Sequence, residues 1–186
     1  ILLDYAKSML DDARERLGDR YTYVCADLYH LPFADRALDT VTQIRVLHHV
    51  ERIDEAFAEV ARCLCAGGSY VLEFANKRNL KAIGRHLTGR QDANPFSQEP
   101  WEFVPLNWNF HPRHVEQELA RAGLALRERR AVSHFRHPLL KRLLPAPALA
   151  RADEALGRPL AGLAPSPSQF LRSAKLTGGA LNEQLW

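Results

Sequence analysis

In the first 76 residues, two patterns of hydrophobic spacing alternate, one typical of helices and one of strands. Apolar side chains recur at helical spacing over residues 6–17, where Gly18 ends the repeat, and again over residues 52–64. Between and around these repeats lie short apolar and β-branched runs, which predict strands. Such alternation of strands and helices is typical of an α/β fold with a mostly parallel sheet and helices on both faces. The strands are expected at residues 1–4, 21–26, 38–44 and 69–75.

The rest of the chain is less regular. A helix is possible over residues 77–87, and a stretch rich in Pro and aromatic residues follows up to Phe110. That stretch suits either a lid or substrate wall, or a segment packed on the sheet edge. Further elements are a helix from Pro112 to residue 122, two short helices within 138–165, and strands at 124–133 and 168–176. The last strand is expected to be antiparallel.

Composition fits one globular domain without a membrane span. The chain has 186 residues, 46% of them hydrophobic and 25% charged. No apolar run approaches the roughly 18 residues that a bilayer requires, and no secretory signal is visible. Cys25, Cys63 and Cys65 are odd in number and lack CxxC spacing. We therefore expect a cytoplasmic protein with free thiols and no metal site.

Charge is unevenly distributed along the chain. Residues 1–76 carry 8 basic and 13 acidic side chains, a balance of −5, whereas residues 77–186 carry 17 basic and 9 acidic side chains, a balance of +8. A basic half suits an anionic substrate, a membrane surface or a nucleic acid. The basic residues are scattered, without a dense run interleaved with aromatics, which favours a solvated surface. No nucleic-acid partner is expected.

Five segments, in order, resemble the class I S-adenosylmethionine-dependent methyltransferases, especially the small-molecule branch that includes the quinone methyltransferases. They match the end of the family's second strand, its acidic loop after the third strand, its fourth strand, the turn before the fifth strand and the helix before the sixth. The segments are residues 3–10, 25–33, 38–50, 62–68 and 110–124. The last 50 or so residues match weakly, as a single domain's variable end would.

The resemblance implies roles for residues that end the strands. Asp4 would accept both ribose hydroxyls of the cofactor, and Tyr5 would lie against the adenine ring. Asp27 would accept the adenine amine while the Leu28 amide donates to the ring. Each carboxylate also has a plain structural alternative: Asp4 as a cap for the next helix, and Asp27 as a residue that stabilises its loop.

Other candidates face the reacting centre or the acceptor. Gln43 belongs to the strand end that would face the sulfonium. His48 is a candidate general base, since its ordinary pKa lies in the useful range, although a structural histidine is the alternative. Asn76 and His111 are candidates on the substrate side. No nucleophile elbow or Ser/His/Asp arrangement is present.

The family's glycine-rich loop is absent from this sequence. Its GxGxG pattern would hold the methionine part of the cofactor after the first strand, and the only Gly-Gly pairs here are at 67–68 and 178–179. The first strand, central in the family's sheet, is expected before residue 1. Without it two inner sheet edges are unpaired, and a protein extended upstream should melt higher. A permuted arrangement using residues 170–179 is the less favoured alternative.

The function implied is methyl transfer from S-adenosylmethionine to a small-molecule acceptor by direct displacement. Residues 1–76 would form the cofactor-binding half of one domain, residues 77–123 a substrate-side insertion and helix, and residues 124–186 the last strands with a helical insertion. Two alternatives stay open: a methyltransferase-like domain that binds without turnover, and a nicotinamide-dependent oxidoreductase, which also uses an acidic residue after its second strand. The sequence leaves the acceptor and the oligomeric state open.

Overall fold

Strands in the described part of the chain form three separate sheets. The computed structural model describes residues 1–132, 142, 144–163 and 165–177. Its largest sheet has four strands in the order β3-β4-β8-β7, and β8 runs antiparallel to both of its neighbours. This confirms a mixed α/β fold with an antiparallel last strand. The strands are β1 (Leu2–Asp4), β2 (Tyr23–Cys25), β3 (Leu38–Gln43), β4 (Leu64–Ala75), β5 (Trp101–Val104), β6 (Asn107–Asn109), β7 (Leu124–Val132) and β8 (Ser168–Lys175).

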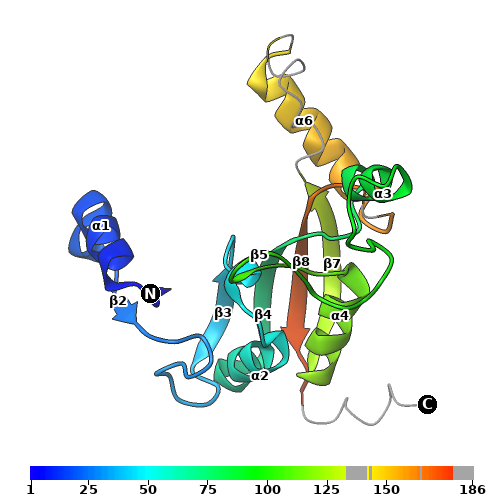
Figure 1. Cartoon of the computed structure of the whole chain (residues 1–186). Coiled ribbons are helices and arrows are strands. Elements are labelled where there is room, and N and C mark those ends of the chain that lie inside the picture. Colours follow the sequence, from blue (N-terminus) through cyan, green and yellow to red (C-terminus); the bar gives the residue numbers. More distant parts are fainter. Residues whose placement is uncertain (133–141, 143, 164, 178–186) are drawn as a thin grey trace.

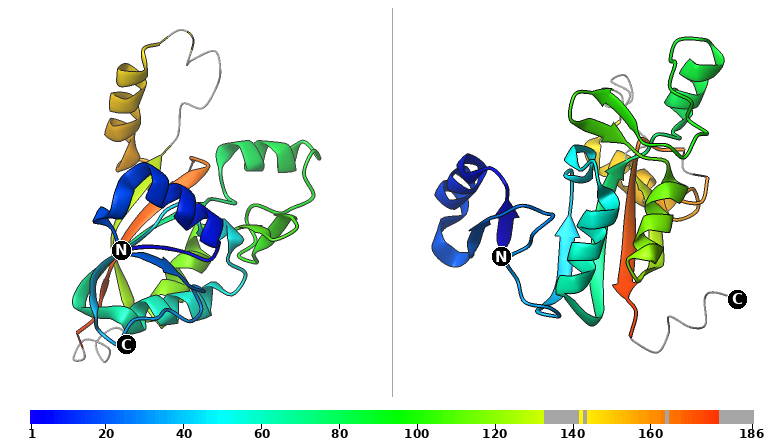
Figure 2. Two further views of the ribbon diagram at one scale, coloured as in Figure 1. Left: turned by 90° about the vertical axis from the view of Figure 1, so that its left-hand side faces the viewer. Right: turned by 60° about the horizontal axis from the view of Figure 1, so that its bottom comes forward.

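The parallel pair β1–β2 stands apart from the four-stranded sheet, as Figure 1 shows. The second view of Figure 2 shows the same separation from another side. Among the described residues β1 has only β2 as a strand partner, and β3 has only β4. The expected pair of unpaired inner edges is therefore confirmed. Both strands are accordingly only partly covered: β1 has no buried residue, and Gln43 is the one buried residue of β3.

Five α-helices have described bounds, and two of them cover one face of the large sheet. The helices are α1 (Lys7–Leu17), α2 (Ile53–Cys63), α3 (Leu80–Leu87), α4 (Pro112–Arg121) and α6 (Ala146–Gly157), with short 3₁₀ turns at Gly18–Arg20 and Leu47–His49. Apolar residues at helical spacing bury one side of α2, including Phe57 and Val60. α4 begins with Pro112 at its first position, where a missing N–H costs nothing, and the His111 side chain caps it.

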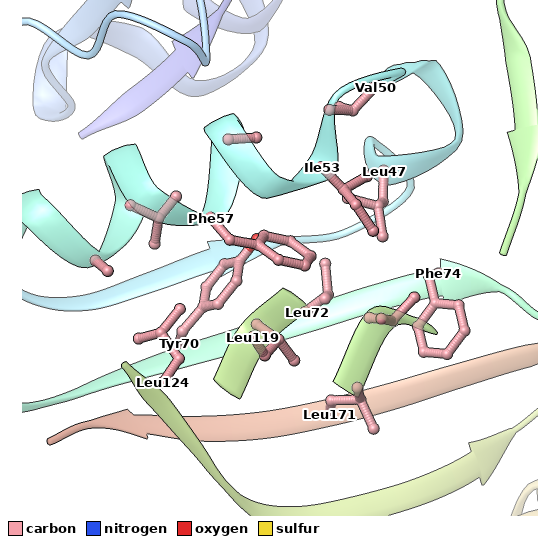
Figure 3. Close-up of a cluster of buried hydrophobic side chains, with 14 of the residues drawn as sticks. Leu47, Val50, Ile53, Phe57, Tyr70, Leu72, Phe74, Leu119, Leu124 and Leu171 are labelled. Atoms are coloured by element: carbon pink, nitrogen blue, oxygen red, sulfur yellow. The ribbon is translucent and has the colours of Figure 1, made fainter. Parts of the chain in front are cut away.

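The core lies between these two helices and the middle of the sheet (Figure 3). Phe57 of α2 meets Tyr70 of β4 edge to face, with ring centroids 5.9 Å apart. Leu119 of α4 and Leu171 of β8 complete the same apolar layer and are almost fully buried. This core anchors β4 and β8, so the carboxyl end of β4 and the loops beyond it are held by a rigid layer.

The structure differs from the sequence expectation in the middle of the chain. Residues 101–109 form an antiparallel hairpin, β5–β6, where the sequence indicated only an irregular stretch. Strand β6 of the hairpin contacts the 3₁₀ turn Leu47–His49 and β4, and its Trp108 packs against the apolar core. Within the expected helical region 138–165 the described residues contain α6. The strand end at 133, the tail beyond 177 and the Gly178-Gly179 pair lie outside the described residues.

Candidate active site

The carboxyl ends of β1 and β2 bring Asp4 and Asp27 to one edge. Asp4 is paired with Cys25 in the register of the two strands, and the Ala26 amide donates to the Asp4 carbonyl at 3.1 Å. Asp27 is the next residue after Ala26 in the chain. Parallel strands end on the same side of a sheet, which is where ligands bind in open α/β folds. The two predicted cofactor carboxylates are therefore neighbours in space.

Each of these carboxylates also shapes its own turn. The Ala6 amide donates to Asp4 Oδ1 at 2.8 Å, just before α1 begins. The Tyr29 amide donates to Asp27 Oδ1 at 2.9 Å, which closes an Asx turn. The loop-stabilising alternative for Asp27 is thus present, whereas α1 has Ala6 at its N-cap and no side-chain cap hydrogen bond, so Asp4 stabilises the turn before the helix without capping it. In both residues Oδ2 has no hydrogen bond to a described residue, so one carboxylate oxygen of each is available to a ligand.

Tyr5 and Leu28 differ in burial. Tyr5 is 78% exposed, and its ring makes no aromatic or cation–π contact with a residue that the structure describes. Leu28 is partly buried and packs against the apolar core. The Leu28 side chain is thus fixed by packing. At Tyr5 the backbone is fixed instead, because its carbonyl accepts a hydrogen bond from Cys25 Sγ at 3.4 Å.

Gln43, at the end of β3, is turned toward the core. Its Oε1 accepts a hydrogen bond from the buried Tyr70 hydroxyl, whose pKa is raised by burial. Its Nε2 is buried and has no partner among the described residues. A buried donor without an acceptor is destabilising by roughly 1–3 kcal/mol. The Gln43 side-chain NH₂ group is therefore unsatisfied beside the strand end where the sequence predicts the reacting centre.

The backbone is strained two residues after the end of β3. Arg45 has φ +59°, a left-handed conformation that non-glycine residues seldom adopt. Its amide donates to Glu73 Oε2 at 2.8 Å, and the Ser168 hydroxyl donates to Glu73 Oε1. Glu73 thus joins the β3 end to β4 and β8. Glu73 was not among the predicted site residues, although a single carboxylate inside the apolar run 70–75 was a visible signal.

His48 lies next to this strained turn. Burial is the main cause that lowers its pKa, with His49 and Arg45 acting the same way and Glu73 opposing them. The imidazole of His48 is accordingly neutral near pH 7, the form that accepts a proton. The His48 and His49 rings are 3.9 Å apart between centroids. Ile44 and Val46, 51% and 41% exposed, provide apolar surface around this turn.

Asn76 and His111 are brought together beyond the end of β4. Asn76 forms a bridge with Phe110, the residue before His111, and its Nδ2 donates to the Ser166 carbonyl at 2.8 Å. Its Oδ1 accepts from the Arg78 amide. The polar atoms of Asn76 thus join the segments around the strand end. His111 is 4% exposed and lines two hollows at the start of α4.

The described part of the chain shows the state of the three cysteines and whether any helix could span a membrane. Cys25, Cys63 and Cys65 are all free thiols, as the sequence predicted. No helix among the described residues has the length and apolarity to cross a membrane.

Comparison with known proteins shows similarity to methyltransferases. Residues 1–72 match the family described as "Methyltransferase domain". A demethylmenaquinone methyltransferase from Thermobifida fusca is 38% identical over 81 residues, which is 41% of this chain and 34% of that protein. The chain spans no more than about a third of the length of the first curated relatives it matches.

Solved structures extend the likeness over nearly the whole chain. A S-adenosylmethionine dependent methyltransferase from Mesorhizobium loti superposes with a TM-score of 0.61 at 19% identity, covering 93% of this chain and 78% of that one. The [4+2]-cyclase SpnF superposes with a TM-score of 0.60 at 20% identity, covering 95% and 66%. Such likenesses show the fold, and the cyclase shows that this fold hosts more than one reaction.

The first 72 residues thus match the methyltransferase domain family, and the chain has the fold of S-adenosylmethionine-dependent methyltransferases. Over about two fifths of its length it is similar to quinone methyltransferases.

The described residues suit one half of the family's cofactor, S-adenosylmethionine. Ribose hydroxyls and an adenine amine are hydrogen-bond donors, and the free Oδ2 atoms of Asp4 and Asp27 are acceptors at adjoining strand ends. The sequence holds no GxGxG loop for the methionine half. These residues therefore fit the adenosine part of the cofactor.

Proposed function

We propose that this chain binds the adenosine part of S-adenosylmethionine through Asp4 and Asp27 and supports methyl transfer to a small-molecule acceptor. One observation carries the proposal: two carboxylates with a free oxygen each end neighbouring parallel strands, inside the segment 1–72 that matches the methyltransferase family. When bound, S-adenosylmethionine supplies a methyl group on a sulfonium, which is already an activated leaving group.

The remaining task of the protein is to position the acceptor. The strained turn at Arg45, the neutral His48 and the exposed apolar side chains of Ile44 and Val46 lie together at the end of β3. In our proposal the apolar side chains hold the acceptor, and His48 takes its proton when the acceptor must lose one. Glu73 acts as a positioning residue, because it fixes the Arg45 backbone.

A quinone-like ring is the acceptor class that we propose. The support is the name of the relatives, demethylmenaquinone and ubiquinone/menaquinone methyltransferases, together with the aromatic hairpin β5–β6 that contacts the His48 turn. The interpretation of the residues after Asn76, through the aromatic stretch to Phe110, as a substrate wall belongs to this proposal. A cytoplasmic location and the absence of a nucleic-acid partner remain predictions.

The test is a methyl-transfer assay with isotopically labelled S-adenosylmethionine and a demethylated quinol, with formation of S-adenosylhomocysteine measured in parallel. We expect transfer that His48→Ala slows and that His30→Ala, a change at an exposed histidine, leaves unchanged. A general base contributes typically 10²–10⁴-fold, so the loss in kcat should be of that order. Equal rates for the two variants would remove His48 from the proposal.

Binding without turnover is the second candidate, because the free carboxylate oxygens of Asp4 and Asp27 suit binding of the adenosine part of the cofactor and supply no chemistry for methyl transfer. It predicts saturable cofactor binding with no methyl release on any acceptor, so the same assay separates it from the enzyme. The nicotinamide-dependent alternative has no support in the family match. A displacement titration with NAD and NADP, expected to show no competition with S-adenosylmethionine, checks that alternative.

A further inference from the structure

Two adjoining hollows lie at the start of α4, away from Asp4 and Asp27. Their volumes are about 210 and about 300 Å³, and both are lined by Arg78, His111 and Arg113. Residue 111 follows Phe110, which bridges Asn76 just past the end of β4. Gln169, near the start of β8, lines the larger hollow. The hollows therefore open at the carboxyl edge of the sheet, on residues that the cofactor site does not use.

Positive charge in these hollows is only partly neutralised. Glu116 and Arg129 both line the larger hollow, and they pair with each other at 2.8 Å. Arg78 and Arg113 make no ion pair with any residue that the structure describes. No acidic residue occupies the first turn of α4, so nothing there offsets the positive end of its dipole. Two guanidinium groups thus face a space without a counter-ion of their own.

His111 adds a hydrogen-bond donor of fixed direction to these positively charged hollows. The Arg113 amide donates to His111 Nδ1 at 3.2 Å. With Nδ1 as an acceptor, the ring carries its proton on Nε2, which makes no hydrogen bond with a described residue. The side chain is nine-tenths buried and lines both hollows. Burial, and then the cations Arg78, Lys77 and Arg113, lower the pKa of His111 to about 4, so the ring is a neutral donor near pH 7.

We propose that these hollows form a binding site for the carboxylate or phosphate group of a small organic anion. Arg78 and Arg113 supply the charge, and His111 Nε2–H supplies a hydrogen bond of fixed direction. The volumes accommodate a few heavy atoms beyond the anionic group itself. Guanidinium groups bind both carboxylate and phosphate through paired N–H donors, so either anion suits the site. This site stands apart from the adenosine site and needs neither cofactor nor methyl acceptor.

The test is titration of the whole chain with malonate and, separately, with inorganic phosphate, followed by calorimetry and by NMR of the histidine ring signals. We expect saturable binding of at least one anion at one site. Arg78→Gln and Arg113→Gln should each weaken it at least about tenfold. Arg127→Gln, which removes the same charge from an exposed residue of β7 outside both hollows, should leave the Kd unchanged.

Arg113 is exposed, so its substitution tests the site even if Arg78→Gln disturbs the fold. Circular dichroism and the Tm of each variant establish that it is folded. Movement of the His111 ring signals on addition of the anion supports the proposal. Failure of both anions to bind, or equal weakening by Arg113→Gln and Arg127→Gln, would overturn it.

Discussion

Asp4 and Asp27 illustrate how far residue types alone predict a site. Each carboxylate accepts a backbone N–H with one oxygen and leaves the other without a described partner, so its local structural contact is compatible with the predicted ligand-binding role. Their positions were predictable because residues that end parallel strands share one edge. Glu73 was not recognised, because its importance depends on Arg45 and Ser168, which reach it through the fold. The roles of Gln43, Asn76 and Tyr5 remain predictions.

The histidine that caps α4 predicts a specific dependence of stability on pH. The folded-state pKa of His111 is about 4, below its ordinary value of 6.5. Between these values the unfolded chain binds more protons than the folded one. The contribution of neutral His111 to the free energy of unfolding is therefore fully present above pH 6.5 and is lost as the pH falls through 4. The Tm should therefore fall more steeply from pH 6.5 to 4 in the wild type than in His111→Asn, which keeps a capping side chain.

Thermal melting at several pH values checks this, with His30→Asn as a control for loss of an exposed histidine. The control should keep the wild-type slope. A parallel decline of wild type and His111→Asn over this range would show that His111 does not titrate as described.

At the level of elements, periodic segments were predictable and the hairpin was not. The expected helices over 6–17 and 52–64 are α1 and α2, shifted by a residue or so, because their apolar stripes leave little choice of face. The β5–β6 hairpin escaped prediction because its strands are short and its turn lacks a standard signal: Leu106 takes φ +63° where glycine or asparagine is usual. Its pairing depends on contacts with β4 and the His48 turn.

Two glycines in different elements should respond oppositely to alanine. Gly84 lies exposed inside α3, where an added Cβ meets nothing within 4 Å. Gly84→Ala should raise the free energy of unfolding by about 0.5–1 kcal/mol, because alanine favours a helix. Gly68 lies in β4, where a Cβ would stand 2.9 Å from the Cys65 carbonyl oxygen and 3.1 Å from that of Asp39.

Gly68→Ala should lower the free energy of unfolding by about 1–3 kcal/mol, because backbone atoms must move. Urea denaturation of the two variants measures both changes. Destabilisation of similar size in both would contradict the local geometry of β4 and α3.

At the scale of the whole molecule, the sheet is divided. β8 has strand partners on both sides, whereas β1 and β3 each have one described strand partner, and the β1–β2 pair lies apart from the large sheet (Figure 1). Unpaired edges expose backbone N–H groups and invite pairing with other chains. The separation of β1–β2 from the large sheet follows from the order of the strands. The family resemblance indicated this order, whereas hydrophobic periodicity alone could not predict it. That a further strand belongs between β1 and β3 stays a prediction, as does the three-part division of the domain.

Hydrogen exchange should report this division directly. Peptides covering β8 should exchange much more slowly than peptides covering β1 or β3, because opening β8 requires disruption of the core. Mass spectrometry after a series of exchange times gives the comparison. Equal protection of β3 and β8 would mean that the edge of β3 is covered in solution.

The central claim is that the two carboxylates at the ends of β1 and β2 hold the adenosine part of S-adenosylmethionine. Calorimetric titration of the chain with S-adenosylmethionine tests it most directly, using Asp4→Asn and, as the matched control, Asp12→Asn on the exposed side of α1. Charge-assisted hydrogen bonds contribute about 1.5–3 kcal/mol, so Asp4→Asn should raise the Kd roughly tenfold or more. Asp12→Asn should bind as the wild type does. Absence of binding by the wild-type chain, or the same Kd in all three proteins, would contradict the account.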